Sequence, residues 1–215
     1  MSDIPIKTAV ITGAHAFDVP AFARLMRVLA NVNAYVQTLD DFAADAGQVR
    51  DWYDAILFYN FHQETPEPGS RVRATLEKLG KTNQGVVVLH HALMAFRDWP
   101  FWSELVGIDH RGRGFHDDQH VTFHVADPDH PITEGVSDWT MIDETYTLDE
   151  PGPDNHVLLT TDHPKSMHSI AWTRTFGQAR VFCYESGHDA HAFDNPHFRT
   201  VLARGLAWVR GRESE

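Results

Sequence analysis

The sequence predicts an α/β fold in which a doubly wound, mostly parallel sheet carries helices on both faces. Three short runs, residues 8–12, 55–59 and 86–89, are dominated by apolar side chains, as expected for strands buried on both faces. Between them, residues 19–29 and 71–79 carry apolar side chains at helical spacing. Strands that alternate with helices in this way favour a parallel sheet with right-handed crossovers.

The remaining elements of the first half follow from local signals. Pro20 suits the first turn of the helix at 19–29. Gly80 is expected to cap the helix at 71–79, because glycine accepts the left-handed backbone of a helix end. Residues 34–39 alternate weakly and are expected to form a further strand, and the aromatic residues 99–105 are expected to form a short helix that packs on the sheet.

The second half of the sequence has a different pattern of apolar and polar residues. Residues 107–118 are polar and contain glycine, which predicts a loop or lid. A hairpin turn is expected at Gly177, and the last helix at 198–209. The whole chain, 1–215, is expected to form one domain, because this length fits one α/β domain and no repeat or linker interrupts it. Short strands are expected at 121–125, 145–148, 157–161, 169–175 and 180–185.

Composition excludes several classes of function. The chain of 215 residues has a formal net charge of −12, which argues against nucleic-acid binding because phosphate contacts need concentrated Lys and Arg. No apolar run approaches a membrane span and the N-terminus lacks a signal-peptide pattern, so we expect a soluble, cytoplasmic protein without a membrane partner. The single cysteine forbids an internal disulfide.

Histidines are unusually frequent, with 15 in the chain, and several follow expected strands. Ligands of open α/β sheets bind beside the carboxyl ends of the strands. We therefore expect a site where the early strands end, at His15, His62, His90 and His91.

A later group is expected to reach the same edge. His188 and Asp189 follow the strand at 180–185, and Asp143 and Glu144 precede the strand expected at 145–148. Histidines with one or two carboxylates can hold a divalent metal such as zinc, or supply a general acid and a general base. No nucleotide cofactor is expected.

These residues are given three predicted roles. The catalytic residues are His90, Glu144, His188 and Asp189, the last as the group that orients an imidazole. Contacts to a small carbohydrate are assigned to His15, His62, His91 and Trp102. The metal ligands are His15, His90 and His188.

Each of these residues also has a structural interpretation. His15 could cap a helix and His62 could be a loop residue. Adjacent side chains cannot both point into one site, and between His90 and His91 we favour His90. Asp143 and Glu144 could be a solvated pair. The aromatic residues 99–102 fit core packing better than a ligand wall, or they could bury the surface of a second copy in a homo-oligomer.

The chain contains a series of short segments in this order: 13–15 (GAH), 86–91 (VVVLHH), 130–135 (HPITEG), 143–146 (DETY), 170–172 (IAW), 177–182 (GQARVF), 187–189 (GHD) and 202–208 (LARGLAW). Together they resemble the ThuA-like (trehalose utilisation) family. This resemblance implies a flavodoxin-like α/β core of the class I glutamine amidotransferase-like superfamily and a role in trehalose or keto-sugar metabolism.

The chain departs from the amidotransferases of that superfamily at the nucleophile. They place a cysteine at a sharp turn after a strand, where this chain has His90 and His91. Cys183 lies inside an apolar run and is expected to act as a small hydrophobe, so glutamine hydrolysis by a Cys-His-Glu triad is not expected. No Gly-x-Ser-x-Gly nucleophile elbow is present either.

Three functional hypotheses remain. The first is a lyase, hydrolase or isomerase that removes a proton beside a sugar carbonyl. The second is a non-catalytic sugar-binding or assembly module in which Trp99, Trp102 and Trp172 stack on sugar rings. The third, a cysteine-dependent amidase or a chaperone, requires a reactive thiol at Cys183.

Overall fold

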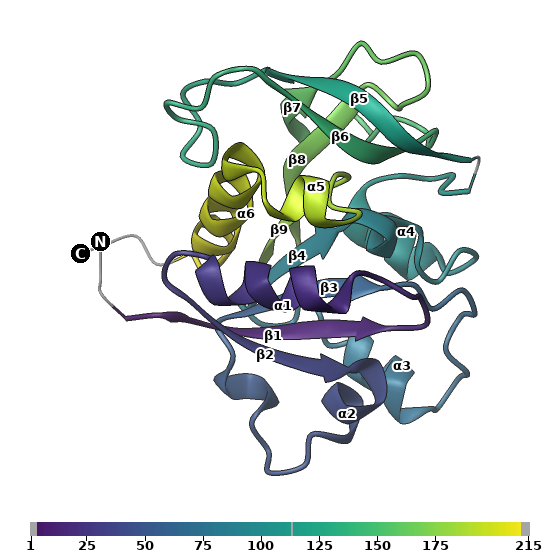
Figure 1. The fold of residues 1–215 in the computed structure, drawn as a ribbon. Coiled ribbons are helices and arrows are strands. Elements are labelled where there is room, and N and C mark those ends of the chain that lie inside the picture. The colour runs from purple at the N-terminus through teal and green to yellow at the C-terminus, as the bar shows by residue number, and fades with distance from the viewer. Residues whose placement is uncertain (1–3, 113, 212–215) are drawn as a thin grey trace.

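The computed structural model describes residues 4–112 and 114–211, in which nine strands form one sheet (Figure 1). Across the sheet the order is β2-β1-β3-β4-β9-β8-β7-β5-β6. The strands are β1 (Ile6–Gly13), β2 (Val32–Thr38), β3 (Ala55–Asn60), β4 (Gly85–Leu89), β5 (Phe115–Val125), β6 (Trp139–Tyr146), β7 (His156–Thr160), β8 (Ser169–Phe176) and β9 (Ala179–Tyr184).

The sheet has a parallel half and an antiparallel half. Strands β2, β1, β3, β4 and β9 pair in parallel. Strands β9, β8, β7, β5 and β6 pair in antiparallel fashion. The prediction of a mostly parallel sheet is therefore correct for one half only, because connections too short for a crossover helix, such as the turn at Gly177, force neighbouring strands to run in opposite directions.

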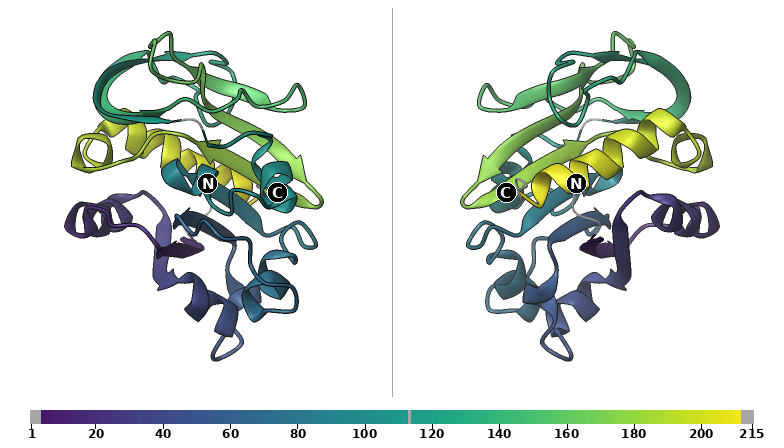
Figure 2. Two further views of the ribbon diagram at one scale, coloured as in Figure 1. Left: turned by 90° about the vertical axis from the view of Figure 1, so that its right-hand side faces the viewer. Right: turned by 90° about the vertical axis from the view of Figure 1, so that its left-hand side faces the viewer.

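Helices cover both faces of the sheet, as predicted. Helices α1 (Val19–Val28), α5 (Ala190–Phe193) and α6 (Pro196–Val209) lie on one face. Helices α2 (Leu39–Ala44), α3 (Arg71–Leu76) and α4 (Pro100–Val106) lie on the other. Figure 2 shows α1 and α6 on one side of the sheet and α3 and α4 on the opposite side. Two 3-10 turns, η1 (Arg50–Trp52) and η2 (His90–Met94), complete the elements of the described segments.

Each face buries its own hydrophobic core. One core joins Phe22 of α1 and Leu202 of α6 to the sheet, and the other joins Trp102 of α4 to Phe58 and Trp172. The helix starts are stabilised by side-chain caps; Asp18, for example, accepts a hydrogen bond from the Ala21 amide at 3.0 Å. None of the described helices combines the length and the apolarity that crossing a membrane would require.

Three local predictions need correction. The helix expected at 71–79 ends at Leu76, and single turns continue to Gly80. The loop expected at 107–118 ends early, because β5 begins at Phe115. The strand expected at 145–148 is the end of β6, so Asp143 and Glu144 lie within a strand and not before one. Helix α2 was not predicted.

Candidate functional site

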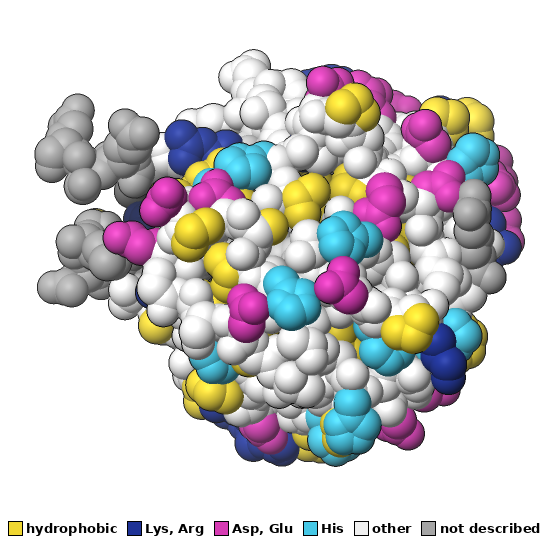
Figure 3. All heavy atoms as spheres, turned by 90° about the horizontal axis from the view of Figure 1, so that it is seen from above, with side chains coloured by type: hydrophobic (Ala, Val, Ile, Leu, Met, Phe, Trp, Pro, Cys, Tyr) yellow, Lys and Arg dark blue, Asp and Glu magenta, His cyan; other side chains and the backbone are white. Residues whose placement is uncertain are grey.

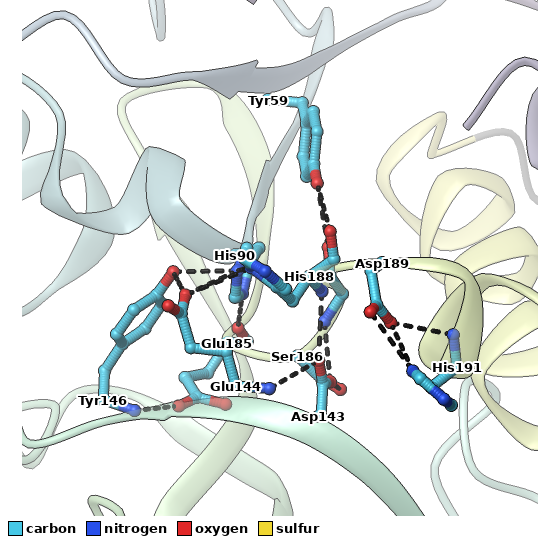
Figure 4. Close-up of polar contacts among 11 residues, drawn as sticks. Tyr59, His90, Asp143, Glu144, Tyr146, Glu185, Ser186, His188, Asp189 and His191 are labelled. Carbon is cyan, nitrogen blue, oxygen red and sulfur yellow. Dashed lines mark hydrogen bonds and ion pairs between the residues drawn. The ribbon is translucent and has the colours of Figure 1, made fainter. Parts of the chain in front are cut away.

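Three segments that are distant in the sequence meet at one point (Figure 4). His90 follows β4, His188 follows β9, and Glu144 lies near the end of β6. Strands β4 and β9 are parallel neighbours, so the two histidines share one edge of the sheet. One ligand atom from each of the three side chains lies within 4.8 Å of the other two. We call His90, Glu144 and His188 the cluster.

His90 has a fixed and strained position. Its φ is 55°, in the left-handed region, directly after β4. The ring is buried, and Nδ1 lies 2.8 Å from the backbone carbonyl oxygen of Glu185. Only an N–H can donate to a carbonyl, so the proton of the neutral ring sits on Nδ1. The lone pair of Nε2 therefore faces Glu144 Oε2 at 3.1 Å and His188 Nδ1 at 3.3 Å.

Glu144 holds the negative charge of the cluster. Its Oε2 lies 3.1 Å from His90 Nε2, 3.4 Å from His188 Nδ1 and 2.5 Å from the Tyr146 hydroxyl. Burial raises the pKa of Glu144, but hydrogen bonds from His188 and Tyr146, together with the nearby His90 ring, outweigh this and hold the pKa well below its usual range. The hydrogen bond between Glu144 and His188 also raises the pKa of His188, although partial burial acts in the opposite direction.

Tyr146 lies between the two buried members of the cluster. Its hydroxyl oxygen is 2.8 Å from His90 Nε2 and 2.5 Å from Glu144 Oε2, so its single proton can serve either acceptor. Burial, together with the charge of Glu144, raises the pKa of Tyr146 well above its usual value, and the phenol is neutral. This residue was not predicted, although its position two residues after Glu144 on a strand places both side chains on one face.

Asp143 orients the turn that carries His188. Its buried carboxylate accepts hydrogen bonds from the Ser186 hydroxyl, from the Gly187 amide at 2.9 Å and from the His188 amide at 3.0 Å. The Tyr59 hydroxyl donates to the Gly187 carbonyl at 3.0 Å from the other side. Asp143 is therefore a positioning residue and not one of a solvated pair.

Glu185 holds the segments around the cluster together through two hydrogen bonds. Its backbone carbonyl accepts from His90, and its side chain accepts from the Tyr146 amide at 2.7 Å. Burial raises the pKa of this carboxyl well above its usual value, with a further contribution from the charge of Asp143. Glu185 thus connects β4, β6 and β9 through its backbone carbonyl and its side chain.

A cavity of about 440 Å³ adjoins the cluster. Glu144 and Tyr146 form the part of its wall that belongs to the site, and Phe61, Met94 and Phe115 contribute apolar surface. A more open depression of about 870 Å³ contains no cluster residue and borders this cavity at Arg97 and Gly112. The other lining residues of the smaller cavity are His15, Gln63, His91, Arg97, Gly112 and Gly114.

His15 and His91 line this cavity, and their role as substrate contacts stays a prediction. Their ring centroids are 4.7 Å apart. The Nε2–H of His91 donates to the Tyr59 carbonyl at 3.3 Å, while its buried Nδ1 has no partner among the described residues. Burial lowers the pKa of His91 to about 2, so the ring is neutral and Nδ1 is a free acceptor. His15 was predicted as a metal ligand, but among the described residues the group close enough to share an ion is His90, Glu144 and His188, so Glu144 takes the place of His15.

Three predicted site residues lie elsewhere. Trp102 is fully buried and donates from Nε1 to the Ala92 carbonyl at 2.9 Å, so it packs in the core and cannot touch a substrate. Asp189 caps α5 by accepting from the His191 amide at 2.8 Å and points away from the cluster (Figure 4). His62 stacks on Phe96 outside the lining of the cavity. The orienting carboxylate is Asp143 and not Asp189.

Histidines and carboxylates are also common on the surface. The face shown in Figure 3 carries both types interspersed, with Lys and Arg side chains toward its margin. His124 lies 2.8 Å from Asp138 and His156 lies 2.8 Å from Asp127, with all four side chains at least partly exposed. Residue type and distance alone therefore do not identify the cluster; its burial and its neighbouring cavity do.

Comparison with known proteins supports one family. A model of the family described as "ThuA: Trehalose utilisation" matches residues 10–209. No curated protein matches the chain.

Among solved structures, a ThuA-like protein from Parabacteroides merdae is 20% identical, with a TM-score of 0.76 over 96% of this chain and 90% of its own. A ThuA-like protein from Bacteroides uniformis is 17% identical, with a TM-score of 0.73 over 97% of this chain and 93% of its own. A cytoplasmic protein from Salmonella typhimurium is 11% identical, with a TM-score of 0.68 over 94% and 98%. At these identities the similarity establishes the shared fold.

Proposed function

Since the chain belongs to the ThuA (trehalose utilisation) family, we propose that it is a cytoplasmic enzyme that acts on a carbohydrate through the cluster. The observation that carries this proposal is the convergence of His90, Glu144 and His188 beside a cavity of about 440 Å³. Perturbed titratable groups that line a cavity are typical of catalytic sites. The cytoplasmic location follows the description of the Salmonella relative.

The spacing of the cluster fits a divalent metal. The three atoms form a triangle with edges of 3.1, 3.3 and 3.4 Å. Zinc at about 2.0–2.1 Å from tetrahedral ligands separates them by roughly 3.3 Å, and two histidines with one glutamate leave a position open. The Nδ1–H of His90 donates to a backbone carbonyl, which is the usual support of a metal-bound imidazole. A bound metal would act as a Lewis acid on a sugar oxygen.

The chain's own groups would carry the proton transfers. A carbonyl on the sugar acidifies the neighbouring C–H. The Glu144 carboxylate lines the cavity and has a second oxygen beside the one that would bind the metal, and this carboxylate removes the proton. The Tyr146 hydroxyl donates a hydrogen bond to the sugar oxygen on which charge develops. Elimination and isomerisation of a keto sugar share this first step, and hydrolysis follows it where water adds to the product of elimination.

The fold also supports an active site at the carboxyl ends of the parallel strands. The parallel strands, in the order β2-β1-β3-β4-β9, follow the pattern of a flavodoxin-like sheet, which binds ligands beside the carboxyl ends of its strands. In this interpretation the strained turn at His90 replaces the nucleophile turn of the class I glutamine amidotransferase-like proteins.

The two other hypotheses have less support. A sugar-binding module built on Trp99, Trp102 and Trp172 would need exposed rings, and all three are buried. A cysteine-dependent mechanism would need an accessible thiol. Cys183 is buried, and burial raises the pKa of its thiol far above the usual value.

The test compares His90→Ala with His124→Ala. Turnover is assayed on trehalose and its keto derivatives, and zinc content is measured by elemental analysis. We expect His90→Ala to lose turnover by at least about 100-fold and to lose zinc, because both need Nε2. His124→Ala should behave as the wild type, since His124 is outside the cluster. Full turnover in folded His90→Ala would refute the proposal.

A further inference from the structure

The cavity beside the cluster has an exposed aromatic ring in its lining. Phe115, the first residue of β5, is 60% exposed and lines this cavity together with Glu144 and Tyr146. Of the large apolar side chains that the described residues expose, Phe115 alone belongs to the cavity. An apolar ring that stays in contact with water at a cavity is typical of a ligand-binding surface, because a ligand can bury it.

A β-bulge turns Phe115 toward the reacting groups. Phe115 pairs with Tyr146 and Gln119 pairs with Asp143, so four steps along β5 (115 to 119) match three along β6 (146 to 143). One residue of β5 is therefore extra, which defines a β-bulge. Because side chains alternate between the faces of a sheet, the extra residue moves Phe115 to the face opposite that of Gln119. Directly paired residues share a face, so Phe115 lies beside Tyr146 on the face that also carries Glu144.

The ring of Phe115 has no ring partner among the described residues. The other rings in the cavity lining each pack against a second ring. Tyr146, for example, packs against His90 with ring centroids 4.8 Å apart. Likewise, Phe61 lies edge-on to His15 with centroids 5.3 Å apart. The exposed ring of Phe115 is therefore the one in the described lining that a ligand can still cover.

We propose that Phe115 stacks on the C–H face of a sugar ring and thereby determines how tightly the substrate binds. This inference rests on the proposed function and deepens it by naming a substrate-binding residue. A sugar ring carries C–H groups on its faces and hydroxyls on its rim, so it can cover an aromatic ring while its hydroxyls reach polar groups. The lining offers such groups in Gln63, Arg97 and Glu144. Stacking is equal before and during proton transfer, so it strengthens binding without changing kcat.

The experiment measures binding and turnover separately. The intact wild type, Phe115→Ala and Phe115→Tyr are titrated in a calorimeter with trehalose and its keto derivatives, and kcat and KM are determined for the keto derivatives. Alanine removes the ring, whereas tyrosine keeps it. Trp52→Ala is the matched control, because Trp52 is also an exposed aromatic residue but lines a different depression. Melting curves establish whether the four proteins are folded equally well.

We expect Phe115→Ala to raise Kd and KM by at least about tenfold and to leave kcat within about twofold of the wild type. Phe115→Tyr and Trp52→Ala should bind within about threefold of the wild type, since both keep the ring in the cavity. Equal Kd in Phe115→Ala and the wild type overturns the inference. An equal loss in Phe115→Ala and Phe115→Tyr overturns it as well, because the ring would then not be the cause.

The outcomes also separate this inference from the proposed function. Weaker binding in Phe115→Ala alone, with no turnover in any of the four proteins, supports the inference and refutes the proposed catalysis. A loss of kcat at unchanged Kd overturns the inference alone, because Phe115 would then act through its neighbour Tyr146. Absence of sugar binding by the wild type overturns both.

Discussion

Histidine beside a carboxylate occurs in two settings in this protein. At the surface, His124 Nδ1 lies 2.8 Å from Asp138 Oδ2, and the side chains are 40% and 55% exposed. In the cluster, His90 Nε2 lies 3.1 Å from Glu144 Oε2, and the side chains are 0% and 9% exposed. The surface pair is the shorter of the two, yet water screens it and leaves it worth at most about 1 kcal/mol. Burial, and not proximity, therefore distinguishes the cluster from the solvated pair.

Burial also determines the protonation of a histidine. The pKa of His91 falls to about 2, mainly because burial disfavours the charged ring. The unfolded chain, with a histidine pKa near 6.5, therefore binds the extra proton first as the pH falls. The stabilisation is complete above about pH 6.5 and is lost as the pH falls toward 2.

The first prediction measures this loss. Below pH 6.5, the free energy of unfolding of the wild type should fall more steeply than that of His91→Gln, by up to about 1.4 kcal/mol per pH unit. The glutamine side chain cannot take the proton, but its amide nitrogen matches the imidazole Nε2 that donates to the Tyr59 carbonyl. Urea titrations at pH 7, 6, 5 and 4 check this. Parallel slopes for the two proteins would contradict a buried, neutral His91.

A second prediction compares two carboxylates of the same chemical type. Asp143→Ala should reduce the free energy of unfolding by about 3 kcal/mol, because the amides of Gly187 and His188 and the Ser186 hydroxyl lose their shared acceptor. Asp138→Ala is the matched surface control and should cost less than about 1 kcal/mol.

Urea unfolding at pH 7 measures both values. Asp143→Ala should also lower turnover, since His188 loses the turn that positions it. Similar stability losses in the two variants would remove the distinction between the buried and the exposed carboxylate.

The smallest expected effect concerns the surface pair itself. His124→Ala should change the free energy of unfolding by less than about 1 kcal/mol, and added salt should reduce that difference further, because the pair is exposed to counterions. Melting curves at about 0.05 M and about 0.5 M NaCl check this, because exposed charges are weakly screened at the lower salt concentration and strongly screened at the higher one. A large effect that survives high salt would mean that exposure is a poor guide to importance in this molecule.

The sequence was most informative where the physical signal is local. Continuous apolar runs identified β1, β3 and β4, and helical spacing identified α1 and α6, because each pattern depends only on neighbouring residues. The antiparallel half was less clear. Its expected loop at 107–118 overlapped β5, since polar alternating residues on an exposed strand resemble a loop.

For the candidate site, the sequence likewise indicated some residues correctly and others not. His90, Glu144 and His188 were identified because polar residues at strand ends meet at one edge. The assignments of Trp102 and Asp189 were wrong, because a tryptophan in the core and a capping aspartate carry no distinct signal in a single sequence.

By itself, the sequence determined which segments form most strands and helices, which family the chain resembles and which histidines are candidates for the site. Only the tertiary structure decided that β6 delivers Glu144 and Tyr146 to the residues after β4 and β9. It also decided that a bulge in β5 lies opposite Glu144. The reason is that local patterns act over a few residues, whereas burial and charge at the site depend on contacts between segments that the chain separates by dozens of positions.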